Sequence, residues 1–508
     1  MAILSLVAPA VLIALAFLVF GLVNSVLFLG VSGCLFLLLV LVGKAWIRRR
    51  LPTLVQNSVG FFHPFADSGG GGERVLWCAV RALQDAYPDL QILIYCKAGN
   101  TAQSLCVRAS SAFSLDVDDT FEVIPLTHCH LISPNSYPRW TMLQQALGSA
   151  HLAYDGLSQA VPQVMVDTSG WAFMYPLFRL AGVKVASYTH YPTISTDMLQ
   201  RVISRQAAFN NDAGVAGSPL KSLVKVVYYY LFAAAYGAVG GCTNVVMVNS
   251  SWTREHISKL WWKFTQPSLV YPPCNVSQLA ALKLDRKLKS LYLVSLAQFR
   301  PEKDQAKQLR AFALARQRAA ALERQREAAI SQGTAVVVVS PFFEAVLAAR
   351  LKVVGSCRNA EDEERVVQLE ALSRALGLND CVDFCVNAPF SEVQQLLGGA
   401  VGGLHTMVDE HFGISIVEYM AAGTIPIAHN SAGPKMDILV DKSCGYLCQS
   451  EEEYANAITE VLQMDQSRRM KIARAARERA LQFSDERFQE GFLRALERGG
   501  LLPLNLHG

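Results

Sequence analysis

The sequence predicts an α/β protein with two domains of parallel sheet behind an N-terminal transmembrane segment. From residue 59 onward, short apolar runs alternate with longer amphipathic segments, the pattern of strands and helices that builds parallel sheets. The chain has 508 residues, enough for two or three domains. Hydrophobic residues make up 52% of it and charged residues only 17%, a composition that indicates contact with a membrane.

The N-terminal segment, residues 1–43, is predicted to be a membrane anchor because residues 2–43 carry no charged side chain. A helix crosses a bilayer with about 20 apolar residues, so one tilted span and a tight hairpin broken near Asn24 and Ser25 both fit. A cleaved secretory signal is disfavoured, because the basic cluster Arg48–Arg50 follows the apolar stretch. Basic flanks stay on the cytoplasmic side, which places the later domains in the cytoplasm.

Charge and cysteine content exclude some classes of protein. The formal net charge of +4 is too small and too scattered to indicate nucleic-acid binding. The 12 cysteines are too few for a dense disulfide framework, and we expect reduced, buried thiols. The pairs Cys381/Cys385 and Cys444/Cys448 lack the spacing and the companion histidines of a zinc site. No metal is therefore expected.

Residues 44–285 are predicted to form the first domain. After an initial strand comes the glycine run Gly69–Gly72, and an amphipathic helix is expected from Arg74 to Tyr87. Glycines let the backbone come close to a bulky anionic ligand at a helix N-terminus, although a flexible turn is the alternative. Functional groups belong at the carboxyl ends of parallel strands, and His190 follows one such strand. The further strands expected are 91–96, 121–126, 164–167 and 183–188.

Residues 222–243 are predicted to be a helix that could associate with the membrane. A full crossing is disfavoured, because it would place the two halves of one site on opposite sides of the bilayer. The segment is therefore either buried in the protein or lies in the interface, with Tyr228, Tyr229 and Tyr230 at headgroup depth. Beyond it, Ser251 or Thr253 is expected to cap the next helix.

The second domain is predicted to span residues 286–481. It opens with the apolar strand Ser290–Phe299, directly followed by Arg300 and Lys303. Two cations at the carboxyl end of a parallel strand could hold a diphosphate, and an exposed basic turn is the alternative. Residues 482–508 are expected to form a helix that crosses back to the first domain.

The stretch Glu410–Asp437 parses as a loop, a helix and a buried strand. Gly413 opens the helix and Gly423 stands where a helix C-cap belongs. The carboxylates of Glu410 and Glu418 would then both lie near the N-terminal end of the helix. That end carries free N–H groups and a partial positive charge, so it suits a phosphate or a sugar rich in hydroxyls.

These residues resemble a known family. Glu410 and Glu418, followed by Gly423-Thr-Ile-Pro426 and Gly433-Pro434, resemble the donor site of retaining glycosyltransferases with two Rossmann-like domains facing a cleft, the GT-B type. Within that superfamily, His405-Thr-Met-x-x-Glu-His-Phe-Gly-Ile414 and Phe62–Glu73 resemble the asparagine-linked glycosylation α-1,2-mannosyltransferases of the endoplasmic reticulum. The resemblance covers roughly residues 57–498.

The resemblance implies a donor, an acceptor and a place. GDP-mannose would supply the fourth and fifth mannoses of a dolichol-diphosphate oligosaccharide, converting Man3GlcNAc2 to Man5GlcNAc2. The catalytic domains would lie on the cytosolic side of the endoplasmic reticulum membrane, with other mannosyltransferases of the same pathway as candidate partners. No cofactor, metal or nucleic acid is implied, and the anomeric configuration would be retained.

The resemblance also assigns roles to residues. Glu410 would bond the mannose hydroxyls and Glu418 the ribose hydroxyls, while the glycine run would face the acceptor. Arg300 is expected to replace an arginine that many members carry where this chain has Gln298. The residues expected to be catalytic are Glu410, His190, Lys303 and Arg300; those expected to bind the donor are Glu418, Gly413, Phe412, Ile414 and Gly355; and the acceptor loop is Gly69, Gly70, Gly71 and Gly72.

Two other functions compete with this reading. A soluble transferase of the glycogen-synthase or sucrose type is disfavoured by the uncharged N-terminus. A non-catalytic membrane scaffold of the same fold is disfavoured because Lys303, Glu410 and Glu418 occur together. The residues alone do not choose guanine over uracil or mannose over another sugar.

Overall fold

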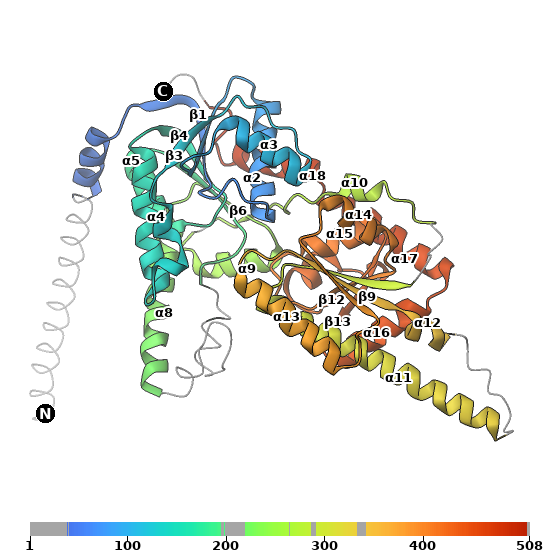
Figure 1. Cartoon of the computed structure of the whole chain (residues 1–508). Helices are drawn as coiled ribbons and strands as arrows, with labels where there is room; N and C mark the ends of the chain where they lie inside the picture. Colours follow the sequence, from blue (N-terminus) through green and yellow to red (C-terminus); the bar gives the residue numbers. More distant parts are fainter. Residues whose placement is uncertain are drawn as a thin grey trace, which may run out of the picture.

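The computed structural model describes residues 38, 40–194, 198, 219–263, 265–285, 291–332 and 342–504. Within them, two parallel sheets with helices on both faces form two domains (Figure 1). Two α/β domains of parallel sheet are what the sequence predicts. The predicted membrane anchor lies almost entirely outside the described residues, and of it only residues 38 and 40–43 are seen, as part of a helix that continues to residue 50.

The first domain holds a seven-stranded sheet of order β3-β2-β1-β4-β5-β6-β7, in which every pairing is parallel. Its strands are β1 Leu54–Phe62, β2 Gln91–Lys97, β3 Glu122–Leu126, β4 Val161–Asp167, β5 Lys184–Thr189, β6 Val245–Val248 and β7 Ser268–Leu269. Its α-helices are α2 Gly71–Ala86, α3 Ala102–Phe113, α4 Thr141–Leu157, α5 Tyr175–Ala181, α8 Pro219–Gly240 and α9 Ser251–Leu260.

The second domain holds a six-stranded parallel sheet of order β10-β9-β8-β11-β12-β13. Its strands are β8 Tyr292–Leu296, β9 Arg350–Gly355, β10 Val382–Val386, β11 Gly402–His405, β12 Ile425–His429 and β13 Tyr446–Cys448. Its α-helices are α10 Val276–Ala280, α11 Gln305–Ser331, α12 Phe342–Ala348, α13 Ala360–Ala375, α14 Phe390–Gly399, α15 Ile414–Ala422, α16 Glu451–Gln463 and α17 Gln466–Ala480. Short single turns include Pro301–Lys303 and Pro434–Ile438.

The sheets are buried on both faces, as their apolar strands require. In β1, Phe61 belongs to the apolar core on one face and Phe62 to the core on the other, because successive side chains of a strand point to opposite faces. Ile427 and Ala428 divide in the same way in the second sheet. The cysteines of the described residues are free thiols, and most of them are buried.

The last helix, α18 (Asp485–Arg498), lies on the first domain although it follows the second in sequence (Figure 1). Phe488, Phe492 and Leu496 belong to the same core cluster as the residues of α2. Arg74 of α2 forms an ion pair with Asp485 at 2.6 Å. The termini of the second domain therefore both connect to the first domain, which brings the carboxyl ends of the two sheets toward one cleft.

Helix α10 belongs with the second domain, whereas the sequence predicts a boundary at residue 285. Val276 and Leu279 pack in the core that covers one face of the second sheet, together with Cys274. A five-residue helix gives too little periodicity to show in advance which sheet it covers.

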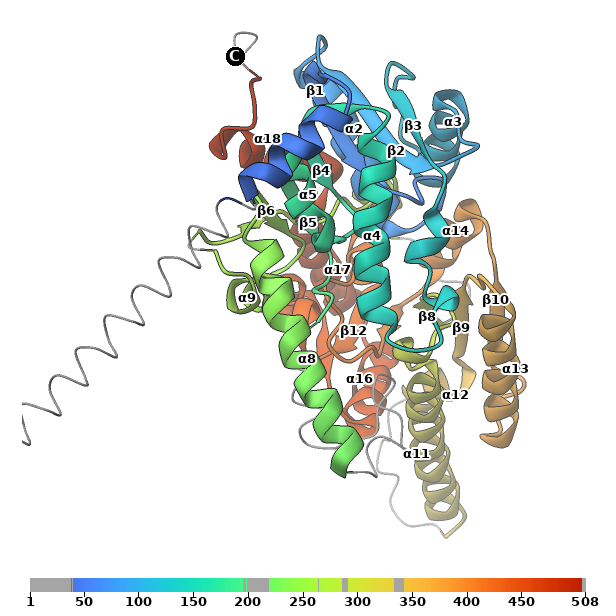
Figure 2. The ribbon, with the colours of Figure 1, turned by 90° about the vertical axis from the view of Figure 1, so that its left-hand side faces the viewer.

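Helix α8 is neither wholly buried nor wholly free. Tyr229, Phe232 and Tyr236 are buried against the first domain, whereas Leu223 and Leu231 are 59% and 67% exposed. Figure 2 shows α8, α4 and the helix of residues 40–50 on the face turned toward the viewer. By length and composition, α8 could cross a membrane, and it is the one such helix among the described residues.

The prediction that three tyrosines of α8 lie together at headgroup depth is wrong for one of them. Tyr229 is buried in the protein, and the ring of Tyr228 packs edge-on against Trp140 with their centroids 5.0 Å apart. Tyr230 is 54% exposed. Three consecutive residues point to different sides of a helix, so they cannot share one depth.

Two helix starts differ from the prediction. Helix α2 begins at Gly71, with Gly70 as its N-cap, so the last two glycines of the run lie inside its first turn. Helix α9 begins at Ser251, and the hydroxyl of Ser250 accepts a hydrogen bond from the backbone N–H of Thr253. Ser250, not Ser251 or Thr253, is therefore the cap.

Candidate active site

A cavity of about 1270 Å³ lies between the two domains. It is lined from the first domain by the loop before α2 and the end of β5, and from the second by the ends of β8, β9 and the start of α15. The carboxyl ends of parallel strands face a shared crevice in such sheets. The predicted site residues on its wall are Gly69, Gly70, Gly71, Gly72, His190, Arg300, Lys303, Gly355, Glu410, Phe412, Gly413, Ile414 and Glu418.

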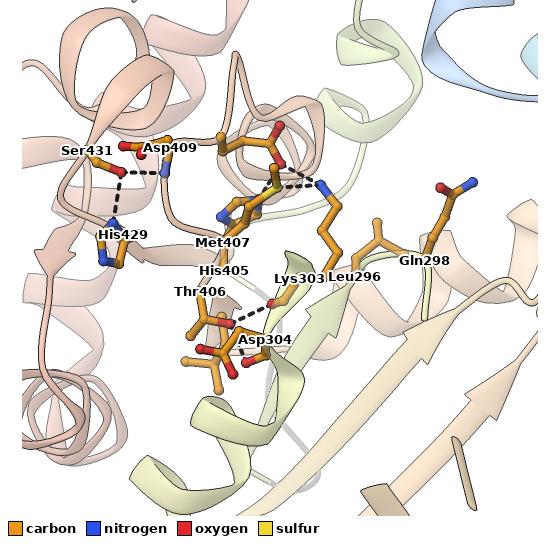
Figure 3. Close-up of polar contacts among 12 residues, drawn as sticks. Leu296, Gln298, Lys303, Asp304, His405, Thr406, Met407, Asp409, His429 and Ser431 are labelled. Atoms are coloured by element: carbon orange, nitrogen blue, oxygen red, sulfur yellow. Dashed lines mark hydrogen bonds and ion pairs between the residues drawn. The ribbon is translucent and has the colours of Figure 1, made fainter. Parts of the chain in front are cut away.

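Lys303 and Glu410 form an ion pair at the centre of the second domain's wall. The Lys303 Nζ atom lies 2.5 Å from Glu410 Oε2 and 3.2 Å from the Met407 sulfur, and it extends from its turn toward the strand-end loop (Figure 3). His405 Nε2 lies 3.1 Å from the same carboxylate oxygen. Among the described residues, no side chain bonds Glu410 Oε1.

The charge of Glu410 is stabilised by its neighbours. Burial raises the pKa of a carboxyl group, but here the Lys303 ammonium and the His405 ring outweigh burial, and the pKa of Glu410 lies well below its usual value. Glu410 is therefore a carboxylate at neutral pH, and it accepts hydrogen bonds without donating any.

The turn that carries Lys303 is fastened to the second sheet. Thr406 Oγ1 lies 2.9 Å from the carbonyl oxygens of both Lys303 and Asp304 (Figure 3). The Gln308 amide donates to Thr406 Oγ1 at 3.0 Å. Asp304 has a positive φ of 46°, and its carboxylate accepts a hydrogen bond from Lys307 N–H at the start of α11. These bonds fix the Lys303 backbone beside the end of β11.

The loop before α15 holds Glu410 against the tip of that helix. Gly413 has φ of +111°, a conformation that favours glycine. The Asp409 N–H donates to Ser431 Oγ at 2.8 Å (Figure 3), and the Gly433 N–H donates to the Glu410 carbonyl at 3.0 Å. A Cβ on Gly433 would lie 2.6 Å from the His411 carbonyl oxygen, so this close approach of two loops requires glycine. Gly423 caps the far end at φ +79°, as predicted.

Glu418 lies one turn inside α15, and its carboxyl group behaves differently from that of Glu410. Burial raises its pKa to about 7, with only Arg74 opposing the shift. No described side chain forms a hydrogen bond with it. A ligand that donates hydrogen bonds would therefore favour the ionised form.

Two arginines add positive charge to the second domain's wall. Arg300 has its Nε atom buried without a hydrogen-bond partner among the described residues, and its guanidinium lies 3.5 Å from Glu302. Arg358 also lines the cavity, held by Asp362 at 2.9 Å. A Cβ on Gly355 would lie 2.1 Å from the Ala297 carbonyl oxygen, so glycine lets β8 and β9 meet there. Gln298 shares this wall and points away from Lys303 (Figure 3).

The glycine loop of the first domain is held by a chain of hydrogen bonds. Glu73 Oε2 accepts from the Gly70 N–H at 2.7 Å, and Oε1 lies 3.3 Å from His63 Nε2. His63 Nδ1 contacts Thr168 Oγ1 at 2.8 Å, and His190 Nε2 donates to the Thr168 carbonyl at 3.0 Å. Burial lowers the pKa of His190 to about 4, so its ring is neutral at neutral pH.

Sequence reasoning gave no role to His405, Arg358, Glu73 or His63. His405 ends the strand that leads to the Glu410 loop, and Arg358 follows the end of β9, so the rule that placed His190 could have found both. Nothing in sequence spacing pairs Glu73 with His63. Among the described residues, no group of three His, Cys, Asp or Glu side chains is arranged to hold a metal ion.

Two parallel-sheet domains that close on a cleft carrying paired carboxylates, cations and a helix N-terminus define a glycosyltransferase of the two-domain GT-B class. Residues 56–261 match the family model described as ALG11 mannosyltransferase N-terminus, and residues 281–479 match Glycosyl transferases group 1. The chain belongs to the family of the GDP-Man:Man(3)GlcNAc(2)-PP-Dol alpha-1,2-mannosyltransferases.

The relatives on which this family assignment rests match most of the chain. The human GDP-Man:Man(3)GlcNAc(2)-PP-Dol alpha-1,2-mannosyltransferase is 42% identical over 480 residues, covering 92% of this chain and 93% of the relative. The enzyme of that name from Dictyostelium discoideum is 37% identical over 451 residues, covering 87% and 85%. Among solved structures, a sucrose-phosphate synthase from Thermosynechococcus elongatus aligns with a TM-score of 0.60 at 16% identity, covering 87% of this chain and 99% of that one.

A second solved structure shares the fold. Anabaena Alr3699/HepE in complex with UDP and glucose aligns with a TM-score of 0.53 at 15% identity, covering 86% of this chain and 99% of that one. Likeness at such low identity supports the fold alone.

Proposed function

We propose that this chain transfers mannose from GDP-mannose, in α-1,2 linkage, to a Man3GlcNAc2 oligosaccharide on dolichol diphosphate, adding the fourth and fifth mannoses. The observation that carries the proposal is that Lys303, Glu410 and Glu418 line one cleft in a chain whose relatives bear that activity in their names. No observation favours a polysaccharide acceptor or a non-catalytic scaffold.

The donor would lie across the start of α15. Arg300, Lys303 and the α15 N-terminus would hold the diphosphate and stabilise the departing GDP, with Arg358 nearby. Glu410 Oε1 would accept bonds from mannose hydroxyls, while Glu418 would accept bonds from the ribose diol. These cations provide the positive charge that the leaving group needs, so we propose transfer without a metal held by the protein.

The acceptor hydroxyl would enter from the first domain, past the glycine loop and His190. Three carboxylates among the described residues line the cavity. Glu73 is bonded to Gly70 and His63, Glu410 is paired with Lys303, and Glu418 would bind the ribose, so none is assigned as a nucleophile. We therefore propose a front-face reaction with retention, in which an oxygen of the departing diphosphate takes the proton of the acceptor hydroxyl.

Membrane contact would come from two places. Residues 1–43 would anchor the chain in the endoplasmic reticulum membrane, with both domains on the cytosolic side. Helix α8, whose Leu223 and Leu231 are exposed, lies on the same side of the molecule as the helix of residues 40–50 (Figure 2). An apolar helix face there fits shallow contact with the leaflet that holds the lipid acceptor.

The test is transfer by the purified full chain in detergent. With GDP-mannose and a lipid-diphosphate Man3GlcNAc2 acceptor, mass spectrometry should detect products heavier by one and by two hexoses. Glu410→Gln should lower kcat by roughly a hundredfold, the usual loss when one group that stabilises the transition state is removed. The amide oxygen can still accept a bond from Lys303, so circular dichroism should show a folded variant, although loss of the partner charge should lower its melting temperature.

Glu392→Gln provides the matched control, because Glu392 lies on α14, is exposed and does not line the cavity. It should leave kcat unchanged. Near-normal transfer by Glu410→Gln, or transfer from UDP-glucose in preference to GDP-mannose, would contradict the proposal.

A further inference from the structure

A cluster of aromatic rings joins the two domains at the edge of the cleft. Tyr191 and Trp252 belong to the first domain, and their rings lie within 5° of parallel, with centroids 6.5 Å apart. His411, from the second domain, places its ring centroid 4.2 Å from Tyr191 and 5.1 Å from Trp252. One side chain of the second domain thus contacts two aromatic side chains of the first.

The contact between Tyr191 and His411 matters because both are sequence neighbours of residues that line the cavity. Tyr191 directly follows His190, and His411 directly follows Glu410. His190 and Glu410 line the cavity from opposite domains. Neighbouring Cα atoms are fixed about 3.8 Å apart, so a contact that joins residue 191 to residue 411 also limits how far residues 190 and 410 can separate.

The Glu410 loop needs support from outside itself. Asp409 has φ of +55°, and Ala432 in the loop packed beside it has φ of +42°. Non-glycine residues in this region of backbone conformation carry a free-energy cost and persist where surrounding contacts hold them. Within the second domain, the loop is held by Ser431 and by the Gly433 N–H.

A second cross-domain contact falls on the same helix of the first domain. The backbone N–H of Ser251, the first residue of α9, lies 2.9 Å and 3.2 Å from the two carboxylate oxygens of Asp437. A carboxylate at a helix N-terminus is favourable. Trp252 is the next residue, so the first turn of α9 receives both Asp437 and His411. The start of α9 is where the Glu410–Asp437 stretch rests on the first domain.

We propose that His411 is a positioning residue, whose ring contacts with Tyr191 and Trp252 dock the Glu410 loop on the first domain and set the separation of Glu410 and His190. The ring acts by packing, since burial lowers the pKa of His411 to about 4 and leaves it neutral at neutral pH. The role rests on the mannosyl transfer proposed above.

The test compares two substitutions of His411 in the full chain. His411→Ala removes the ring, and kcat should fall by about five- to a hundredfold, the factor that corresponds to losing two aromatic contacts. His411→Phe keeps a ring of similar shape, and kcat should stay within about threefold of the wild type. The Kd for GDP-mannose, measured by calorimetry, should change much less than kcat, because the nucleotide contacts lie elsewhere.

A double substitution and a control complete the test. Tyr191→Ala combined with His411→Ala should be little slower than the slower single variant, because both remove one contact. His130→Ala, at an exposed histidine of the first domain, should match the wild type.

Three results would overturn the positioning role: normal kcat in His411→Ala, equal losses in the Ala and Phe variants, or additive losses in the double variant. A wild-type chain that transfers no mannose would instead overturn the proposed function.

Discussion

Glu410 and Glu418 show how the surroundings shift the pKa values of two nearby carboxyl groups in opposite directions. Glu410 has a cation at 2.5 Å and a pKa well below its usual value, whereas Glu418 has no hydrogen-bond partner in the part of the chain that the structure describes and a pKa raised by burial to about 7. The first keeps its charge at any physiological pH. The second can lose or gain a proton near neutral pH, so a ligand that bonds the Glu418 carboxylate would bind in a pH-dependent way.

The affinity for GDP-mannose should therefore depend on pH through Glu418. Below pH 7 the empty site holds a protonated Glu418, which must lose its proton to accept two bonds from a diol, so binding should weaken by up to about tenfold per pH unit below the pKa. Calorimetry from about pH 6 to about pH 8 measures this slope. Glu418→Gln should bind more weakly at the high end and lose most of the slope; the same slope in both proteins would contradict the role.

The same shift has a consequence for folding. The pKa of Glu418 is higher in the folded than in the unfolded chain, so the folded state binds more protons between about pH 4.5 and about pH 7. Its contribution to the free energy of unfolding falls as pH rises through that window. A buried carboxylate without a partner is thus a cost that the empty enzyme bears at neutral pH, and the donor would relieve it.

Helix α2 illustrates how one side chain organises a glycine loop. Glu73 bonds the backbone of Gly70 and the ring of His63, whose other nitrogen contacts Thr168. A Cβ on Gly71 would lie 2.7 Å from the end of the Ile414 side chain in α15, so the loop reaches the second domain across the cleft. The loop is therefore a fixed wall of the cavity.

Glu73→Ala should remove this support. It deletes the acceptor at the start of α2 and should lower the free energy of unfolding by about 1–2 kcal/mol, the usual cost of losing a helix N-terminal cap. Chemical denaturation followed by circular dichroism measures the change. Glu452→Ala, at an exposed first-turn glutamate of α16, is the control and should cost no more than about 0.5 kcal/mol. Equal effects of the two substitutions would show that the loop does not depend on Glu73.

Helix α18 connects the two domains, since it follows the second domain in sequence and packs on the first. Polar contacts on α18 include the ion pair of Asp485 with Arg74 and a hydrogen bond from the Tyr87 hydroxyl to Glu497. The Arg74 side chain is 8% exposed and that of Asp485 is 18% exposed. Arg74 also lines the cavity and donates to the Phe113 carbonyl. Arg74 therefore both binds α18 and forms part of the cavity wall.

Asp485→Asn should lower the stability of the first domain by about 3 kcal/mol, because it leaves a buried guanidinium without its partner charge. The midpoint of urea denaturation should fall accordingly. Glu490→Gln on the same helix removes an ion pair with Arg487 whose side chains are 65% and 54% exposed, and such a pair contributes at most about 1 kcal/mol. If both variants unfold at the same midpoint, the Arg74 pair does not fasten α18.

The sequence allowed the layout of the fold to be predicted, because alternating strands and helices force parallel sheets whose carboxyl ends share an edge. His190, Lys303 and Glu410 all follow strands, so their presence on one cleft follows from topology. Gly413 and Gly423 follow from the backbone conformations at helix ends. The bond between Lys303 and Glu410 could not be foreseen, since it depends on side-chain directions from two different crossovers.

Other features depend on tertiary packing that leaves no local pattern. The ring of His411 reaches Tyr191 and Trp252 from another domain, and no periodicity records such a contact. Helix α10 is too short for its face to be read. For α8, composition showed an apolar helix, but which tyrosine faces outward depended on what packs against it.

In the ion pair of Lys303 and Glu410, each side chain neutralises the charge of the other. An anion such as inorganic phosphate could bind Lys303 only by breaking the ion pair with Glu410. That carboxylate would then be left without its partner cation. In the proposed arrangement, a nucleotide sugar would offer its diphosphate to Lys303 and its hydroxyls to Glu410, so both charges would keep a partner. After transfer of the sugar, the remaining GDP would again compete with Glu410 for the Lys303 ammonium group, which would favour release of GDP.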